Sequence, residues 1–130
     1  MTSKLEFFFN PKSIAVIGAS RIPGKIGYEA LKNVLIYDYK GSVYPVNPNA
    51  DEILGLKCYS SVKDIKDKID LAIIVVPAEL VPDILEECGK KGVKGAIIIS
   101  SGFIEIGDYE LGERVLKIAR KYKMRLLGPN

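Results

Sequence analysis

Short continuous runs of apolar residues recur along the chain and alternate with segments in which apolar residues lie three and four positions apart. Runs of the first kind, rich in β-branched residues, are typical of strands that are covered on both faces of a sheet. They predict strands at residues 13–17, 42–46, 71–76, 96–99 and 125–127. The run at 71–76 is the longest, and Pro77 ends it, because proline cannot donate a ladder hydrogen bond.

Three segments between these runs have the spacing of amphipathic helices. They cover residues 25–37, a stretch that begins near Leu80 and stops at Gly89 or Gly92, and residues 109–123. The predicted buried faces are Ile26, Ala30, Leu31, Val34 and Leu35 in the first helix, Leu80, Val81, Ile84, Leu85 and Cys88 in the second, and Leu111, Val115, Ile118, Ala119 and Tyr122 in the third. Residues 53–59 are ambiguous, and Ser60 or Ser61 is a candidate N-cap for a short helix that runs to Ile69.

Alternation of strand and helix patterns favours an α/β fold, a Rossmann-like parallel sheet of about five strands with helices on both faces. In such a sheet, ligands bind outside the carboxyl ends of the strands. Four segments follow predicted strands at that edge, namely the loop from Gly18 and residues 45–49, 76–78 and 100–107. We expect these segments to converge on one groove.

The loop at residues 18–27, which joins the first predicted strand to the first predicted helix, has the features of a phosphate-binding turn. Unpaired backbone N–H groups at the start of a helix attract anions, since the helix dipole is positive there. Ser20 adds a hydroxyl, and Arg21 and Lys25 add two positive charges. The alternative interpretation is a glycine-rich connection that binds no ligand.

Composition limits the classes of function. A chain of 130 residues with 48% hydrophobic content fits a single domain, and its net charge of +3 is interspersed rather than clustered as in nucleic-acid binders. Its two cysteines lack metal-ligand spacing, so we expect no metal, and they indicate a reducing cytoplasm. No apolar run approaches the ~20 residues needed to span a bilayer. The absence of histidine, tryptophan and glutamine beside abundant lysine, glutamate and isoleucine resembles heat-adapted proteins.

A dinucleotide is the first candidate ligand, because a glycine-rich turn after the first strand begins that fingerprint. Two features argue against NAD. The glycines are spaced as Gly18, Gly24 and Gly27 rather than as G-x-G-x-x-G, and the second strand ends in Val46 and Asn47 instead of an acidic residue that would hold a ribose. An NAD-binding Rossmann module therefore stays an alternative.

Several short motifs occur in a characteristic order over nearly the whole chain. They are NPKSIAVIGAS at 10–20, VYPVNP at 43–48, ILG at 53–55, VPA at 76–78, SGFIE at 101–105 and GPN at 128–130. This order resembles the N-terminal CoA-binding domain of the ADP-forming acetyl-CoA synthetase (acyl-CoA synthetase) family, which is related to the succinyl-CoA synthetase alpha subunit. The resemblance implies one CoA-binding domain at residues 1–130, belonging to a longer synthetase chain.

Family members join an acid to CoA at the expense of ATP, or run the reverse reaction, through a phosphorylated histidine in another domain. The resemblance implies that CoA contacts three sets of residues. Gly18, Ala19, Ser20, Arg21, Pro23 and Lys25 would meet the phosphates, Val46, Asn47, Pro48, Val76 and Pro77 would line the nucleotide groove, and Ser100, Ser101 and Gly102 would face the pantetheine arm.

The chain contains no histidine, so we expect it not to be competent alone and to work with downstream domains or separate subunits that carry the phosphohistidine and ATP-grasp parts. Ser101 and Glu105 lie in a loop that either touches the reacting end of CoA or a partner domain, or is a solvated turn. No catalytic residue is predicted in this chain. A free-standing CoA-binding protein with a regulatory or storage role is the remaining alternative.

Overall fold

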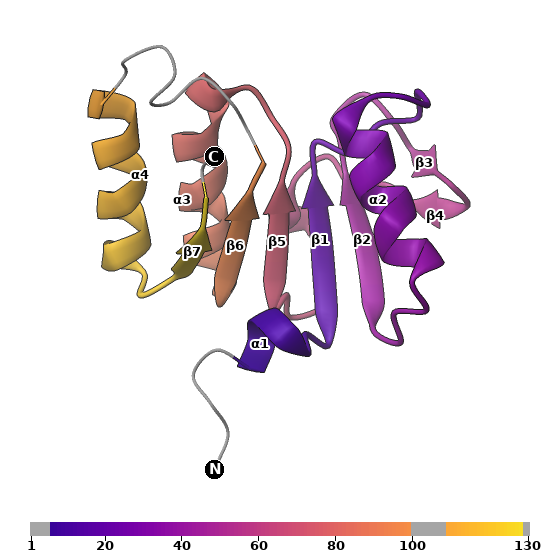
Figure 1. Cartoon of the computed structure of the whole chain (residues 1–130), viewed down its shortest axis with the longest axis horizontal. Coiled ribbons are helices and arrows are strands. Elements are labelled where there is room, and N and C mark those ends of the chain that lie inside the picture. Colours follow the sequence, from indigo (N-terminus) through magenta and orange to yellow (C-terminus); the bar gives the residue numbers. More distant parts are fainter. Residues whose placement is uncertain (1–5, 100–108, 129–130) are drawn as a thin grey trace.

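A five-stranded parallel sheet forms the centre of the molecule (Figure 1). The computed structural model describes residues 6–99 and 109–128. The strand order is β2-β1-β5-β6-β7. The strands are β1 (Ser13–Ile17), β2 (Ser42–Val46), β5 (Leu71–Ile74), β6 (Gly95–Ile98) and β7 (Arg125–Leu127). The α/β fold with a Rossmann-like parallel sheet, predicted from the alternating patterns, is thus confirmed.

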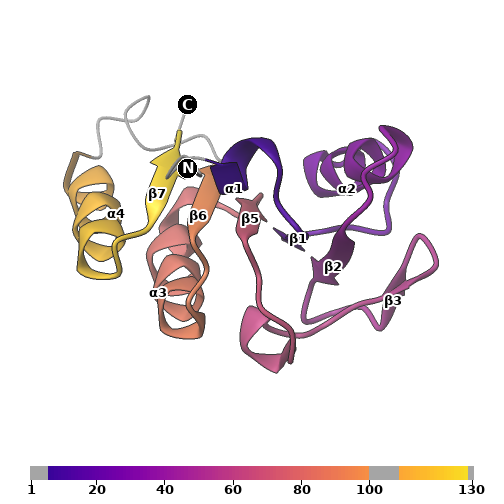
Figure 2. The same cartoon turned by 90° about the horizontal axis from the view of Figure 1, so that it is seen from below.

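Helices lie on both faces of this sheet. In Figure 2, α2 (Ile26–Ile36) lies on one side, whereas α3 (Val81–Lys91) and α4 (Tyr109–Lys121) lie on the other. The short helix α1 (Glu6–Phe9) lies on the same side as α2. Between β2 and β5 the chain forms a hairpin of β3 (Glu52–Ile53) and β4 (Leu56–Lys57) and then the 3-10 turn η1 (Val62–Asp64). A second 3-10 turn, η2 (Ala78–Leu80), follows β5 and precedes α3.

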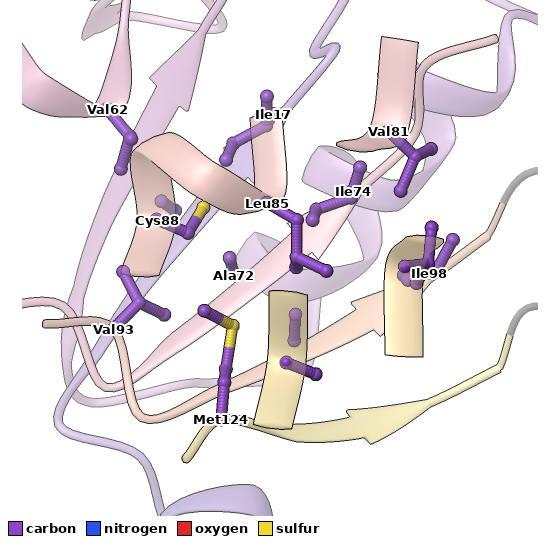
Figure 3. Close-up of a cluster of buried hydrophobic side chains, with 14 of the residues drawn as sticks. Ile17, Val62, Ala72, Ile74, Val81, Leu85, Cys88, Val93, Ile98 and Met124 are labelled. Atoms are coloured by element: carbon purple, nitrogen blue, oxygen red, sulfur yellow. The ribbon is translucent and has the colours of Figure 1, made fainter. Parts of the chain in front are cut away.

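Two hydrophobic clusters hold these layers together, because successive strand residues point to opposite faces. Ile17, Ile74 and Leu85 belong to the cluster under α3 and α4 (Figure 3). Val16 and Leu31 belong to the cluster under α2. Burial of one such aliphatic side chain is worth about 1.5–3 kcal/mol, so each helix is held mainly by its apolar face.

The strand at 71–76 is shorter than predicted. β5 ends at Ile74, although the backbone N–H of Val75 still donates to the carbonyl of Ile17 at 2.8 Å. Beyond that bond the neighbouring strand β1 has ended, and Gly18 turns away with a φ of +94°. The ladder between β1 and β5 therefore ends at Val75.

The predicted helix from Ser60 or Ser61 to Ile69 is wrong beyond its first turn. Ser61 does cap η1, since its side chain accepts a bond from the backbone N–H of Lys63 at 3.2 Å, but the turn ends at Asp64. Ile65 is extended, with φ −79° and ψ 122°. Downstream, the Ser13 hydroxyl donates to the carbonyl of Lys68 at 2.7 Å, and this contact with β1 holds the segment in an extended path.

Two helices bury fewer of their apolar residues than the spacing predicts. Ile26 and Leu35 of α2 are exposed, and the residues that α2 buries are Gly27 and Leu31. Leu80 is also exposed, because α3 begins one residue later and Leu80 lies in the preceding 3-10 turn. The C-terminal stop of α3 is Gly92, in the left-handed conformation with φ 91°. In the part of the chain that the structure describes, no helix is long and apolar enough to cross a membrane.

Candidate functional site

Gly18 places the loop after β1 directly against the end of β5. Its φ of +94° belongs to the left-handed region, and a Cβ on this residue would lie 2.1 Å from the carbonyl oxygen of Val75. No residue with a side chain fits this close approach without displacing the backbone. Gly18 therefore packs the end of β1 directly against the end of β5, at the carboxyl edge of the sheet.

Gly27 fixes the first turn of α2 against the same point. A Cβ there would lie 2.0 Å from the carbonyl oxygen of Gly18, so the helix packs backbone to backbone on the loop. Gly24, with φ +92°, forms the turn between them. The positive end of the helix is consequently held at the mouth of the β1 loop, as seen at the top of β1 in Figure 1.

Some backbone N–H groups of this loop and of the helix start are hydrogen-bonded within the protein, and others are not. The N–H of Gly18 donates to the carbonyl of Val46 at 2.9 Å, and that of Ile22 donates to the Ser20 hydroxyl at 3.0 Å. Among the described residues, no group accepts a bond from the N–H of Ile26 or Gly27 at the start of α2. Lys25, the N-cap residue, makes no side-chain cap bond. These two amides and the Lys25 ammonium are therefore free to bind an anion.

A pocket of about 350 Å³ opens at this position. Five of the predicted site residues, Gly18, Ser20, Lys25, Val76 and Pro77, line it. Its other lining residues are Ile26, Gly27, Val75 and Ile99. Of the four segments expected to converge on one groove, the loop from Gly18 and the segment at 76–78 line this pocket, whereas residues 45–49 do not. The fourth segment, 100–107, lies outside the described residues.

Other predicted residues occupy different positions. Arg21 and Pro23 are exposed on the loop, Ala19 and Val46 are buried, and none of the four lines the pocket. Pro48 is exposed and does not line the pocket. Ser100, Ser101, Gly102 and Glu105 lie outside the described residues.

Asn47 does not line the pocket; it ties the loop to the sheet. Its side-chain amide donates to the carbonyl of Ala19 at 2.8 Å, and its side-chain oxygen accepts from the backbone N–H of Asn49 at 2.8 Å. Both ends of the amide are thus engaged within the protein. Sequence reasoning placed Asn47 at the groove but missed this bond, because a long-range partner of a loop side chain leaves no periodic signal.

A larger hollow of about 720 Å³ lies at the C-terminal ends of α3 and α4. Lys94, Arg120 and Lys123 form part of its lining. These cations sit at or beyond the C-terminal ends of the two helices, where the dipole is negative and favours positive side chains. Their position is explained by the helices. We therefore place the candidate anion site at the smaller pocket, where the two unpaired amides lie beside Lys25.

The two cysteines are buried and form no disulfide. Burial raises the pKa of the Cys88 thiol to about 12, and burial also raises the pKa of Cys58. Both thiols are therefore protonated and unreactive at neutral pH. Among residues 6–99 and 109–128, no group of three or more His, Cys, Asp or Glu side chains is arranged to hold a metal ion.

The profile of a protein family described as "CoA binding domain" matches residues 12–130. The chain belongs to this family. The ligand of the family is CoA, whose diphosphate and further phosphate suit the anion site at the start of α2.

Similar proteins are much longer than this chain. The ADP-forming acetate–CoA ligase of Methanocaldococcus jannaschii is 55% identical over 127 residues, which are 98% of this chain and 18% of that protein. The alpha subunit of ADP-forming acetate–CoA ligase I of Pyrococcus furiosus is 54% identical, over 97% of this chain and 29% of the subunit. The chain thus spans less than a third of these relatives.

A solved structure has the same fold. It is the acetyl-coenzyme A synthetase 1 of Ca. Korarchaeum cryptofilum, in complex with phosphate and ADP, which is 54% identical and superposes with a TM-score of 0.94 over 97% of this chain and 27% of that one. The chain therefore matches the CoA-binding part of ADP-forming acetyl-CoA synthetases, in sequence and in fold.

Proposed function

We propose that residues 1–130 form the CoA-binding domain of an ADP-forming acetyl-CoA or acyl-CoA synthetase. The observation that carries this proposal is the pocket at the end of β1 and β5, where the unpaired amides of Ile26 and Gly27 lie beside Ser20 and Lys25. The family match and the length of the similar ligases support the assignment. In the complete enzyme this domain would hold CoA while other parts perform the ATP-linked chemistry.

The proposed contacts divide the CoA molecule along the carboxyl edge of the sheet. The diphosphate would lie against residues 18–27, with the Lys25 ammonium and the exposed Arg21 guanidinium offsetting its charge. Val76 and Pro77 would line the nucleotide side of the pocket. From the family resemblance, the loop at 100–102 would face the pantetheine arm.

Asn47 takes a different part in this proposal from the one expected. Its amide binds the carbonyl of Ala19 and the N–H of Asn49, so it would shape the phosphate loop rather than contact CoA. Val46 acts similarly, since its carbonyl fixes the N–H of Gly18. Pro48, exposed beside them, stays a proposed groove residue from the resemblance alone.

The remaining chemistry would come from elsewhere in the enzyme. The family reaction passes through a phosphorylated histidine, and this chain contains none. We propose that downstream domains or separate subunits supply that histidine and the ATP-grasp part. The free and buried cysteines are consistent with a reducing cytoplasm.

Affinity of the isolated domain for CoA should be modest. Charge-assisted hydrogen bonds contribute about 1.5–3 kcal/mol each. Association costs on the order of 4–15 kcal/mol. A few phosphate contacts therefore predict a Kd in the micromolar range or weaker, roughly −8 kcal/mol or less favourable.

Isothermal titration calorimetry of the purified chain tests the proposal. CoA should bind more tightly than dephospho-CoA and NAD, because it carries the most phosphate charge near Arg21 and Lys25. The double variant Arg21→Ala, Lys25→Ala should lose about 1.5–3 kcal/mol for each of its two cations, which raises the Kd by at least about a hundredfold.

The matched control is Lys40→Ala, which removes one exposed cation that pairs with Asp38 at 3.0 Å and lies between α2 and β2. This variant should bind CoA like the unmodified chain. Tighter binding of NAD than of CoA would contradict the proposal. So would an equal loss of CoA affinity in the double variant and in Lys40→Ala.

A further inference from the structure

Five side chains on one face of the sheet form a continuous row across all five strands. The parallel register pairs Pro45 with Val16, Val16 with Ile73, Ile73 with Ile97, and Ile97 with Leu127. Because paired residues of neighbouring parallel strands point to the same side, these five lie side by side. The row therefore crosses the sheet from β2 at one edge to β7 at the other.

The burial of these five side chains decreases from the β2 edge of the sheet to the β7 edge. Pro45 and Val16 are fully buried, Ile73 and Ile97 are half-buried, and Leu127 is 51% exposed. Ile99, two residues beyond Ile97, is 36% exposed as well. Among the described elements, α2 covers β1 and β2 from this side, the short helix α1 lies near the start of β5, and no longer helix lies in front of β6 or β7 (Figure 1).

The opposite side of the same strands is covered. There Ala96 and Ile98 of β6 are buried, in the cluster that also contains Leu85 of α3 and Val115 of α4. Parallel sheets are found almost only with both faces covered, since their strands are apolar on both sides. The β6 and β7 end of this face is thus an apolar strand surface that lacks the cover found on the other side.

We propose that Ile73, Ile97, Ile99 and Leu127, the β5–β7 face, form the docking surface for a helix from another part of the same synthetase polypeptide. The inference rests on the proposed function, because it requires the chain to be a part of a longer enzyme. Its support is that the similar ligases carry this region as 18–29% of their length, so most of each polypeptide lies outside it.

The face also defines the chemistry of the helix. An aliphatic stripe would pack on Ile97 and Leu127, as α2 packs on the other end of the row. Arg125 lies on the same face, two residues before Leu127, and forms no ion pair with any described residue. The docked helix is therefore expected to present a carboxylate opposite this guanidinium.

Thiol labelling of a Leu127→Cys variant tests the inference. The variant is made in the 130-residue chain and in the full-length native polypeptide that contains it, and the labelled peptide is quantified by mass spectrometry. The introduced thiol should react rapidly in the short chain and at least about tenfold more slowly in the long one, as expected for a thiol exposed only by local opening. The native Cys58 and Cys88 are buried and contribute little background.

Leu116→Cys is the matched control, since Leu116 is a leucine of similar exposure, 44%, on α4 instead of the β5–β7 face. Its labelling rate should be the same in both polypeptides. Equal labelling of the Leu127→Cys variant in both polypeptides, equal protection of both positions, or a native polypeptide that ends at residue 130 would overturn the proposal.

A second variant separates this surface from the CoA site. Leu127→Lys should lower the Tm of the full-length polypeptide but not that of the short chain, and it should leave CoA binding by the short chain unchanged. An unchanged Tm of the long polypeptide contradicts the docking surface, whereas failure of CoA to bind contradicts the proposed function instead. If protection of the Leu127→Cys thiol in the short chain rises with protein concentration, a second copy of this chain covers the β5–β7 face, and the proposal of a helix from the same polypeptide is wrong.

Discussion

At the scale of single residues, two missing Cβ atoms decide how closely the loop at residues 18–27 approaches the sheet. Gly18 passes the end of β5 where a Cβ would meet the carbonyl of Val75, and Gly27 packs on Gly18 itself. The two contacts bring a strand end, a loop and a helix N-terminus to one point. The amides of Ile26 and Gly27 face that point because of them.

Gly27→Ala should therefore destabilise the protein and weaken CoA binding. The new Cβ would lie 2.0 Å from the Gly18 carbonyl oxygen, so α2 must shift, at a cost of about 1–3 kcal/mol. Urea denaturation measures the loss. Gly112→Ala is the control, since nothing lies within 4 Å of its Cβ in α4, and alanine there should stabilise by about 0.5–1 kcal/mol. Equal effects of the two substitutions would refute the close packing.

Cys88 makes the free energy of unfolding depend on pH in the alkaline range. Its folded-state pKa of about 12 lies above the ordinary value of 9.0, so the unfolded chain loses the thiol proton first. The resulting stabilisation is fully present below about pH 9 and is lost as pH rises toward 12. The free energy of unfolding should fall by up to about 1.4 kcal/mol per pH unit more steeply than in Cys88→Ala. Parallel profiles of the two proteins over that alkaline range would contradict this.

At the scale of elements, the site depends on how the end of β2 is tied to the loop after β1. The carbonyl of Val46 and the side chain of Asn47 bind the backbone on either side of the Gly18 turn. One strand end thus fixes the loop that follows another. A loop held in this way is preorganised for a ligand and loses little freedom on binding.

Asn47→Asp should impair CoA binding more than Asn47→Ala. Both variants lose the bond to Ala19, worth about 0.5–1.5 kcal/mol of stability, but aspartate also places a carboxylate against a carbonyl oxygen and adds negative charge beside the loop. Calorimetry with CoA and thermal denaturation measure the two effects. Asn49→Asp, which adds the same charge on an exposed neighbour, is the control and should bind CoA nearly normally.

Most elements could be predicted because their signals are local. The apolar runs predicted β1 and β2 with their observed bounds, and of the two glycines predicted as the stop of α3, Gly89 and Gly92, the second ends it. The segment from Ser61 to Ile69 could not be predicted, since its path depends on hydrogen bonds to distant residues such as Ser13. The same reason hid the packing of Gly27 and the bond made by Asn47, which are contacts between elements.

At the scale of the whole molecule, the sheet has two unequal sides. One is closed by α3 and α4, and the other is closed by α2 over β1 and β2 but leaves Ile99 and Leu127 exposed. The proposed CoA pocket opens at the carboxyl edge, between the end of β1 and the end of β6. Ligand and docked helix would thus meet at Ile99, which belongs to both surfaces.

A second group of cations, Lys94, Arg120 and Lys123, lines the larger hollow at the C-terminal ends of α3 and α4, away from the loop at residues 18–27. We assign the anion to the loop because Lys25 there accompanies free amides at the start of a helix. A crystal structure of this chain with CoA tests that assignment most directly. The diphosphate should lie against residues 18–27, within hydrogen-bond distance of the amides of Ile26 and Gly27. A diphosphate bound at Lys94, Arg120 and Lys123, or anywhere else on the surface, would contradict it.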